Sequence, residues 1–159
     1  GVRNIIVSGR HSPRLMMARL IGADMVIDAE KEDVYHRVME ATGGVGASLV
    51  VECTGQLSVW EESTKLVARG GTIILFGGLP KGTTASFDTA RLHYDQITLK
   101  GVFHFSRSAV KRAYELLASG RVRVKDLITG SYTLEDMKKV IDHLIDGNCL
   151  KLEIVPDSK

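Results

Sequence analysis

The chain has 159 residues, of which 44% are hydrophobic and 25% charged, so it can form one domain with a buried core and is unlike a disordered chain. Lys and Arg total 21 against 19 Asp and Glu, a net charge of +2, and this balance argues against a nucleic-acid clamp or a basic membrane-binding patch. No apolar run approaches the ~20 residues of a membrane helix, so we expect neither nucleic acid nor a membrane as partner.

The cysteines also limit the class of protein. Cys53 and Cys149 lie far apart and have no CxxC or Cys/His spacing, which excludes a disulfide scaffold and a structural zinc cluster within this chain. The first residues lack the pattern of a signal peptide. We therefore expect a cytoplasmic protein.

Short apolar runs alternate with amphipathic segments in the first half of the chain. Strands are expected at residues 4–8, 25–28, 48–53 and 72–76, and helices at 12–21, 32–42 and 57–68. In the first helix Ser12 is the expected N-cap and Pro13 the first helical residue. Because the strands are continuous apolar runs, the alternation predicts parallel strands covered on both faces, in a doubly wound α/β sheet.

The second half of the chain has a different rhythm. A polar loop is expected at residues 79–93, strands at 97–105, 127–129 and 150–155, and helices at 106–119 and 133–145. The run between Leu99 and Phe103 would lie at the edge of the sheet, and edge strands invite pairing with another chain.

The first strand and the glycine turn of a dinucleotide-binding sheet are missing. Such a sheet begins with a strand, a G-x-G-x-x-G turn and a helix that binds the pyrophosphate, whereas the cluster Gly43, Gly44 and Gly46 follows a helix and precedes a strand. The missing strand is central in the order 3-2-1-4-5-6. We therefore expect a truncated piece or a partial sequence, with the gap filled by residues 150–155 or by a strand of a neighbouring chain.

Six stretches match a known family in their order and spacing. They run from Arg14 to Asp24, Val50 to Gly55, Gly70 to Gly78, Ile97 to Gly101, Leu116 to Gly120 and Leu150 to Pro156. The chain thereby resembles the cofactor-binding half of medium-chain zinc-dependent alcohol dehydrogenases, especially the sorbitol/iditol and threonine dehydrogenase branch. The resemblance implies a Rossmann-type fold, with a partial dinucleotide-binding domain in residues 1–120. Residues 121–159 would form a C-terminal strand–helix–strand segment that returns to the catalytic domain.

The same resemblance implies where the metal lies. The family holds its catalytic zinc in the N-terminal half, which this sequence lacks, and the five histidines here have no partner at ligand spacing. We therefore expect zinc in the missing catalytic domain, and neither a metal site nor a catalytic residue in this chain.

The end of the first strand indicates the choice of cofactor. NAD-specific members of such folds carry an acid there for the ribose 2′-hydroxyl, but this strand ends in Ser8, Gly9 and Arg10. Arg10 offers a bidentate donor to a phosphate, and Arg14 lies one turn further on. This pattern favours NADP over NAD, with a solvated loop charge as the alternative for Arg10.

Three later strand ends are also expected to contact the cofactor, because ligands lie outside the carboxyl ends of parallel strands. The resemblance implies that these strand ends contact the ribose and adenine, the nicotinamide and the pyrophosphate. The residues concerned are Cys53, Thr54, Phe76, Gly77, Gly78, Phe103 and His104. Alternatives stay open: Cys53 as a small buried hydrophobe, the glycines as a turn that needs positive φ, and His104 as an exposed strand end.

The resemblance implies an oxidoreductase that transfers a hydride between NADP or NAD and a secondary alcohol, such as a polyol, or its ketone. This chain would supply the cofactor-binding part and be inactive alone, and a homo-oligomer would form through the edge strand between Leu99 and Phe103. One alternative is a zinc-free quinone or enoyl reductase of the same superfamily. Another is a nucleotide-binding or dimerisation module without chemistry of its own.

Overall fold

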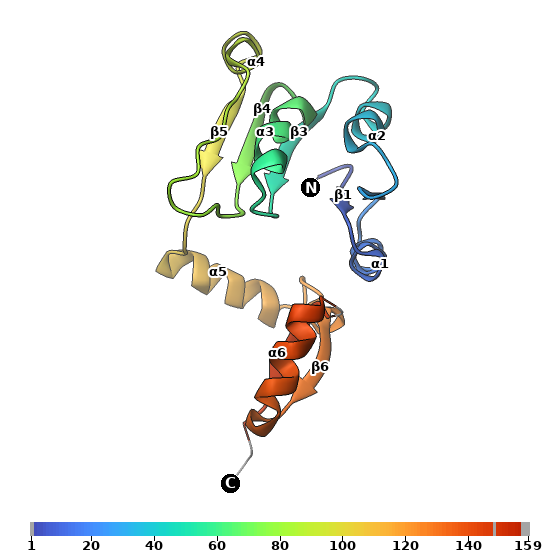
Figure 1. Cartoon of the computed structure of the whole chain (residues 1–159), viewed down its shortest axis with the longest axis vertical. Coiled ribbons are helices and arrows are strands. Elements are labelled where there is room, and N and C mark those ends of the chain that lie inside the picture. Colours follow the sequence, from blue (N-terminus) through green and yellow to red (C-terminus); the bar gives the residue numbers. More distant parts are fainter. Residues whose placement is uncertain (1, 148, 157–159) are drawn as a thin grey trace. The chain divides into compact units, whose positions relative to one another are not determined.

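The computed structural model describes residues 2–147 and 149–156. The chain forms two compact units, one built from Gly1–Lys31 and Ser106–Lys159 and the other from Glu32–Phe105. In both units, parallel strands alternate with helices along the chain (Figure 1). The predicted α/β class with parallel strands is therefore confirmed.

A three-stranded parallel sheet in the order β3-β4-β5 forms the centre of the 32–105 unit. Its elements are α2 (Val34–Ala41), β3 (Ala47–Glu52), α3 (Leu57–Leu66), β4 (Val67–Leu75), α4 (Thr89–Tyr94) and β5 (Thr98–Gly101). Helix α3 packs on β3 and β4 (Figure 1). The core consists of Val67, Ile73 and Leu75, with Val50 and Trp60 packed against it. This packing fixes the ends of β3 and β4 relative to α3.

The other unit contains two parallel strand pairs. Its first part consists of β1 (Ile6–Gly9), α1 (Ser12–Leu20) and β2 (Met25–Asp28), with β1 paired to β2. Its second part consists of α5 (Arg107–Ala118), η1 (Lys125–Leu127), β6 (Ile128–Tyr132), η2 (Leu134–Asp136), α6 (Met137–Asp146) and β7 (Lys151–Ile154). Strand β6 pairs with β7, so the expected C-terminal strand–helix–strand order is present.

Strand β4 differs from its predicted position. The strand begins at Val67, directly after α3 ends at Leu66. The sequence predicts that the helix continues to residue 68 and that the strand begins at residue 72. The register moves from Ala47 opposite Val67 to Leu49 opposite Thr72, so residues 68–71 form a bulge. Gly70 has a φ of +70°, which glycine adopts without a Cβ penalty. The Gly70–Gly71 pair therefore marks an irregularity inside the strand and not its start.

Three other boundaries also differ from the predictions. His11 is the N-cap of α1, so Ser12 is already helical. The loop expected at 79–93 contains α4, because the Asp88 carboxylate accepts the N–H groups of Ala90 and Arg91 and caps a short helix. Strand β5 ends at Gly101, so residues 102–105 follow the strand and do not belong to it.

The expectation that residues 150–155 fill the position of a missing central strand is wrong, because β7 pairs with β6. Within the described residues, β1 pairs only with β2, and β3 pairs only with β4. Leu49 and Val51 on β3 each remain 49% exposed. Strand β3 is thus an edge of its sheet. In the part of the chain that the structure describes, no helix combines the length and the apolar character needed to cross a bilayer.

Candidate functional site

The candidate cofactor residues all lie at or after the carboxyl end of a parallel strand, apart from Arg14 in the first turn of α1. Ser8 and Gly9 end β1, and Arg10 follows them. Cys53 and Thr54 follow β3, Phe76 to Gly78 follow β4, and Phe103 and His104 follow β5. The first group belongs to the 1–31 and 106–159 unit and the other three to the 32–105 unit.

The end of β1 leaves room for a ligand. Ser8, Arg10 and Arg14 are exposed, and the Gly9 carbonyl accepts the N–H of Ala29 at 2.8 Å. Gly9 has no positive φ, and a Cβ built there would approach only the Leu15 side chain, at 3.4 Å. Neither backbone conformation nor packing therefore requires glycine at position 9.

Residues 53–55, the β3 turn, are held by a buried carboxylate. Glu52, the last residue of β3, is 3% exposed. Its Oε1 accepts the N–H groups of Thr54 and Gly55, at 2.6 and 3.1 Å, and the Thr54 hydroxyl. Several donors to one carboxylate offset the cost of burying its charge. The Thr54 hydroxyl is thus engaged inside the protein rather than directed freely at a ligand.

Residues 76–78, the β4 turn, lie directly against the β3 turn. The Glu52 carbonyl accepts the N–H groups of Phe76 and Gly77, both at 2.9 Å, and the Trp60 indole N–H donates to the Gly77 carbonyl at 2.9 Å. A Cβ at Gly77 would collide with the Gly55 backbone N and lie 2.6 Å from Glu52 Oε2. The structure therefore brings the two turns together, and Gly77 is required by their contact.

The neighbouring glycine has a different role. Neither Gly77 nor Gly78 has a positive φ, so the alternative that both serve a left-handed turn is wrong. A Cβ at Gly78 would meet nothing within 4 Å, and Phe76 is 65% exposed. The β4 turn thus presents an open backbone surface at Gly78, where a ligand can approach closely.

The residues after β5 are exposed. Phe103 and Phe105 are 88% and 77% exposed. His104 between them has a φ of +57°, and its ring stacks edge-on against Phe103 at a centroid distance of 3.8 Å. The interpretation of His104 as the end of a strand is wrong, because β5 ends three residues earlier; a positive φ in a non-glycine residue carries strain of about 1 kcal/mol or more.

Cys53 is exposed and not a buried hydrophobe. Partial burial of its sulfur and, to a smaller extent, the charge of Glu52 raise the pKa of the Cys53 thiol. A raised pKa means a smaller thiolate fraction at neutral pH, and the thiolate is the reactive form.

We therefore expect the native protein to be alkylated at Cys53 but not at the buried Cys149. The rate at pH 8 should be lower than in the unfolded chain and should rise with pH beyond the ordinary cysteine range. Iodoacetamide labelling followed by peptide mass spectrometry, with Cys149→Ser as the control, measures both. Labelling of native Cys53 as fast as in the unfolded chain would contradict the shift.

The described residues contain no cluster of three His, Cys, Asp or Glu side chains placed to hold a metal ion.

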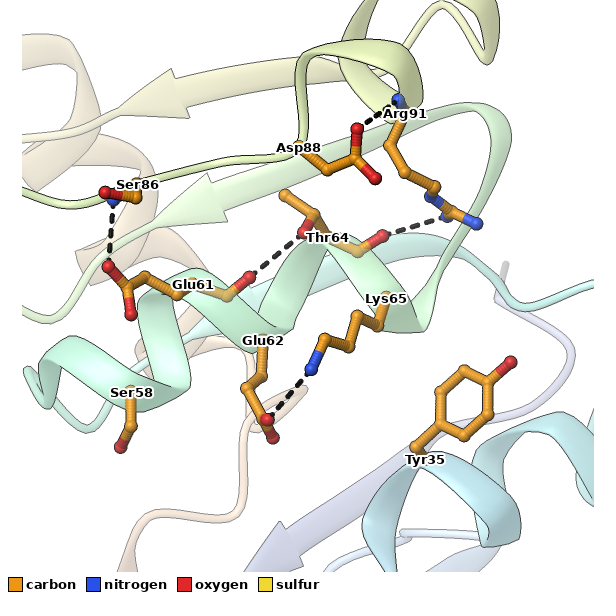
Figure 2. Close-up of a pocket in the computed structure, with 9 residues that line it drawn as sticks. All are labelled: Tyr35, Ser58, Glu61, Glu62, Thr64, Lys65, Ser86, Asp88 and Arg91. Atoms are coloured by element: carbon orange, nitrogen blue, oxygen red, sulfur yellow. Dashed lines mark hydrogen bonds and ion pairs between the residues drawn. The ribbon is translucent and has the colours of Figure 1, made fainter.

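A surface cavity of about 420 Å³ lies between α2, α3 and the segment at α4 (Figure 2). Its polar groups pair with one another: Glu61 accepts the Ser86 N–H at 2.9 Å, and Lys65 pairs with Glu62 at 3.1 Å. No residue of the β3 or β4 turn lines it. This cavity is therefore separate from the paired turns.

The sequence profile of a family described as zinc-binding dehydrogenase matches residues 1–119. The chain belongs to this family. The resemblance to medium-chain zinc-dependent alcohol dehydrogenases, stated from the sequence, is thereby confirmed.

Curated relatives of this zinc-binding dehydrogenase chain include a dehydrogenase named for a sugar alcohol and one named for an amino acid. It is 26% identical to D-arabinitol dehydrogenase 1 of Uromyces fabae, covering 99% of this chain and 46% of that protein. It is 29% identical to L-threonine 3-dehydrogenase of Bacillus licheniformis, covering 98% and 45%. The chain thus spans about half the length of the curated relatives it matches.

Solved structures share the fold. An oxidoreductase/dehydrogenase of unknown specificity from Escherichia coli matches with a TM-score of 0.89 and 27% identity, over 99% of this chain and 45% of that one. A zinc-binding dehydrogenase from Sinorhizobium meliloti, solved bound to NADP, matches with a TM-score of 0.84 and 23% identity, over 98% and 45%. The second likeness concerns the fold alone.

Sequence reasoning missed two residues that hold the turns, Glu52 and Trp60. A single acid at the end of an apolar strand, with Thr-Gly two residues further on, is a detectable signal for Glu52, because buried carboxylates need nearby donors. The bond from Trp60 to Gly77 spans 17 residues and leaves no local pattern.

Proposed function

We propose that this chain is the cofactor-binding part of an oxidoreductase that transfers a hydride between NADP or NAD and a secondary alcohol, such as a polyol, or its ketone. The observation that carries the proposal is the contact of the β3 and β4 turns at adjacent carboxyl ends of a parallel sheet, in a chain of the zinc-binding dehydrogenase family. Nucleotides bind at such strand ends. The names of the relatives support an alcohol or polyol as the substrate class.

The strand pairing supports a Rossmann-type doubly wound sheet without its first strand. Strands β1-β2 and β3-β4-β5 form two parallel blocks. In the strand order 3-2-1-4-5-6 of such a sheet, β1 and β2 would correspond to strands 2 and 3, and β3, β4 and β5 to strands 4, 5 and 6. The open edge of β3 and the exposed Leu49 and Val51 fit that assignment.

The residues of this chain fit a dinucleotide by binding and orientation. A nicotinamide cofactor supplies or accepts the hydride when it is bound. Gly78 allows close approach of a ribose to the backbone, while Glu52 holds Thr54 and Gly55 in place. Phe103 and His104 follow β5, the strand that pairs with β4. Both residues are exposed and could contact the pyrophosphate or the nicotinamide amide.

NADP is the proposed cofactor and NAD the second candidate. Position 9 carries no acid, and Arg10 and Arg14 are exposed cations beside it. The Sinorhizobium meliloti structure of the same fold, solved bound to NADP, supports this choice.

We expect Gly9→Asp to weaken NADPH binding by about tenfold or more, because a carboxylate there repels a 2′-phosphate and suits a ribose 2′-hydroxyl. NADH affinity should stay equal or rise. Isothermal titration with both nucleotides measures this. Val45→Asp, on an exposed loop before β3, adds the same charge elsewhere as a control. An unchanged ratio of NADPH to NADH affinity would contradict the assignment.

The zinc site is proposed to lie in the part of the zinc-binding dehydrogenase relatives that this chain does not span. The experiment that tests the function uses the protein expressed from its whole reading frame. Alcohol-dependent reduction of NADP⁺ that is lost after treatment with a zinc chelator, with nucleotide binding retained, is the expected result. Chelator-resistant reduction of quinones or enones would favour the zinc-free reductase. Nucleotide binding without turnover on any of these substrates would favour a binding module.

A homo-oligomer joined through the edge strand is also part of the proposal. Strand β5 is the last strand of its sheet, with Thr98 and Lys100 exposed and Leu99 half-buried. Edge strands with free backbone groups pair readily. Sedimentation velocity should give at least twice the mass of one chain, and a monomer at all concentrations would contradict it.

A further inference from the structure

We propose that Glu52 and Trp60 are positioning residues that hold the β3 and β4 turns in one fixed arrangement for the cofactor. This inference rests on the proposed function, because the turns are the proposed nucleotide site. Neither residue is a candidate for contact with the nucleotide itself. Both act through the backbone of Thr54, Gly55 and Gly77.

Glu52 is an unusual residue for its place in the fold. It ends the strand Ala-Ser-Leu-Val-Val-Glu and is 3% exposed. Within the described residues it takes part in no salt bridge, and its partners are instead the N–H groups of Thr54 and Gly55 and the Thr54 hydroxyl. Burial of a charge costs free energy, which hydrogen bonds offset. A local geometrical role therefore explains this carboxylate better than a general contribution to stability.

The same residue reaches the second turn. Its carbonyl accepts the N–H groups of Phe76 and Gly77, both at 2.9 Å. Its Oε2 occupies the side of Gly77 where a side chain would otherwise extend. Glu52 thus contacts the β3 turn through its carboxylate and the β4 turn through its backbone and side chain.

Trp60 completes the restraint at the carbonyl of Gly77. Its ring packs against the Val67, Ile73 and Leu75 core, and its indole N–H donates to the Gly77 carbonyl at 2.9 Å. Both ends of Gly77 are therefore bonded, its N–H to Glu52 and its carbonyl to Trp60. This fixes the direction of the chain into Gly78, whose open surface is the proposed approach for the ribose.

Nucleotide affinity depends on such restraint, because a binding site must be held to within roughly 0.5 Å by its supporting residues. Loosening either turn should therefore weaken binding even where no contact to the nucleotide is removed. The two restraints act on one peptide, so their effects should be coupled rather than additive.

The test uses two conservative variants in the protein expressed from its whole reading frame. Glu52→Gln keeps the shape of the side chain and removes the charge, and Trp60→Phe keeps an aromatic ring and removes the indole N–H. Each is expected to raise the dissociation constant for NADPH about tenfold, and the double variant should raise it by clearly less than the product of the two. Isothermal titration well below the melting temperature measures all three.

Arg91→Lys is the matched control. Arg91 supports the junction of α3 and β4, at the other end of β4 from the β4 turn, so the variant lowers the melting temperature without touching the paired turns. Its dissociation constant for NADPH should equal that of the wild type.

Unchanged NADPH affinity in both variants, with a loss of melting temperature alone, would overturn the inference and leave a purely structural role. If Arg91→Lys raises the dissociation constant for NADPH as much as Glu52→Gln and Trp60→Phe do, the inference is overturned as well. Failure of Glu52→Gln to fold leaves Trp60→Phe to decide the question. Wild-type protein that binds neither NADPH nor NADH identifies failure of the proposed function, and the inference falls with it.

Discussion

Replacement of Gly77 by alanine is expected to lower the free energy of unfolding by roughly 3 kcal/mol, at the upper end of the usual cost of overpacking a closed site. The new Cβ would collide with the Gly55 backbone N and lie 2.6 Å from Glu52 Oε2 and 2.9 Å from Gly55 Cα. Two of these neighbours are backbone atoms of a turn that Glu52 holds in place, so they cannot move without loss of its hydrogen bonds. Urea unfolding followed by circular dichroism measures the change.

Gly78→Ala is the matched control for this experiment. Its Cβ meets nothing within 4 Å and its φ is not positive, so stability should change by less than about 0.5 kcal/mol. We expect its effect on NADPH affinity to exceed its effect on stability, because the methyl group would occupy the open surface of the β4 turn. Equal destabilisation by the two substitutions would contradict the described contact between the turns.

Arg91→Lys is expected to cost about 2 kcal/mol of stability. One guanidinium nitrogen, Nη2, donates to the carbonyls of Thr64 and Val67 at 2.9 and 3.0 Å, and Figure 2 shows the side chain reaching Thr64 at the end of α3. Thr64 and Val67 are 4% and 1% exposed, so these carbonyls have little access to water. A lysine ammonium lacks the planar fork that also places Nε beside Asp95.

Arg69→Lys serves as the comparison, since Arg69 pairs with the same Asp95 at 3.0 Å but its side chain is 86% exposed. Exposed ion pairs contribute little, so its stability should stay within about 0.5 kcal/mol of the wild type. Thermal and urea unfolding of both variants give the two values. A larger loss for Arg69→Lys than for Arg91→Lys would show that Asp95, and not the α3–β4 junction, is the important partner.

The sequence predicted the alternation of strands and helices well, because continuous apolar runs separated by glycine mark buried parallel strands. The sequence-based prediction failed where one residue type is common in two different local structures. The Gly70–Gly71 pair signalled the end of a helix but forms a bulge inside β4, and Asp88 in a polar loop caps a helix that has too few residues to show a periodicity. Tertiary pairing, as in β6 with β7, has no local signal.

The candidate site was predicted in outline only. The carboxyl ends of strands follow from fold class alone, and they led to Thr54, Gly77 and Gly78. The supporting residues depend on bonds between distant positions, such as Trp60 to Gly77. The reason for Gly77 also lies in such a contact, with Gly55 and Glu52, and could not be read from the glycine itself.

Isothermal titration of the protein, expressed from its whole reading frame, with NADPH and NADH tests whether the paired turns are a cofactor site. We expect NADPH to bind with a lower dissociation constant than NADH, and Gly9→Asp to reverse the order. Binding of neither nucleotide at millimolar concentration would contradict the assignment of the paired turns as a cofactor site.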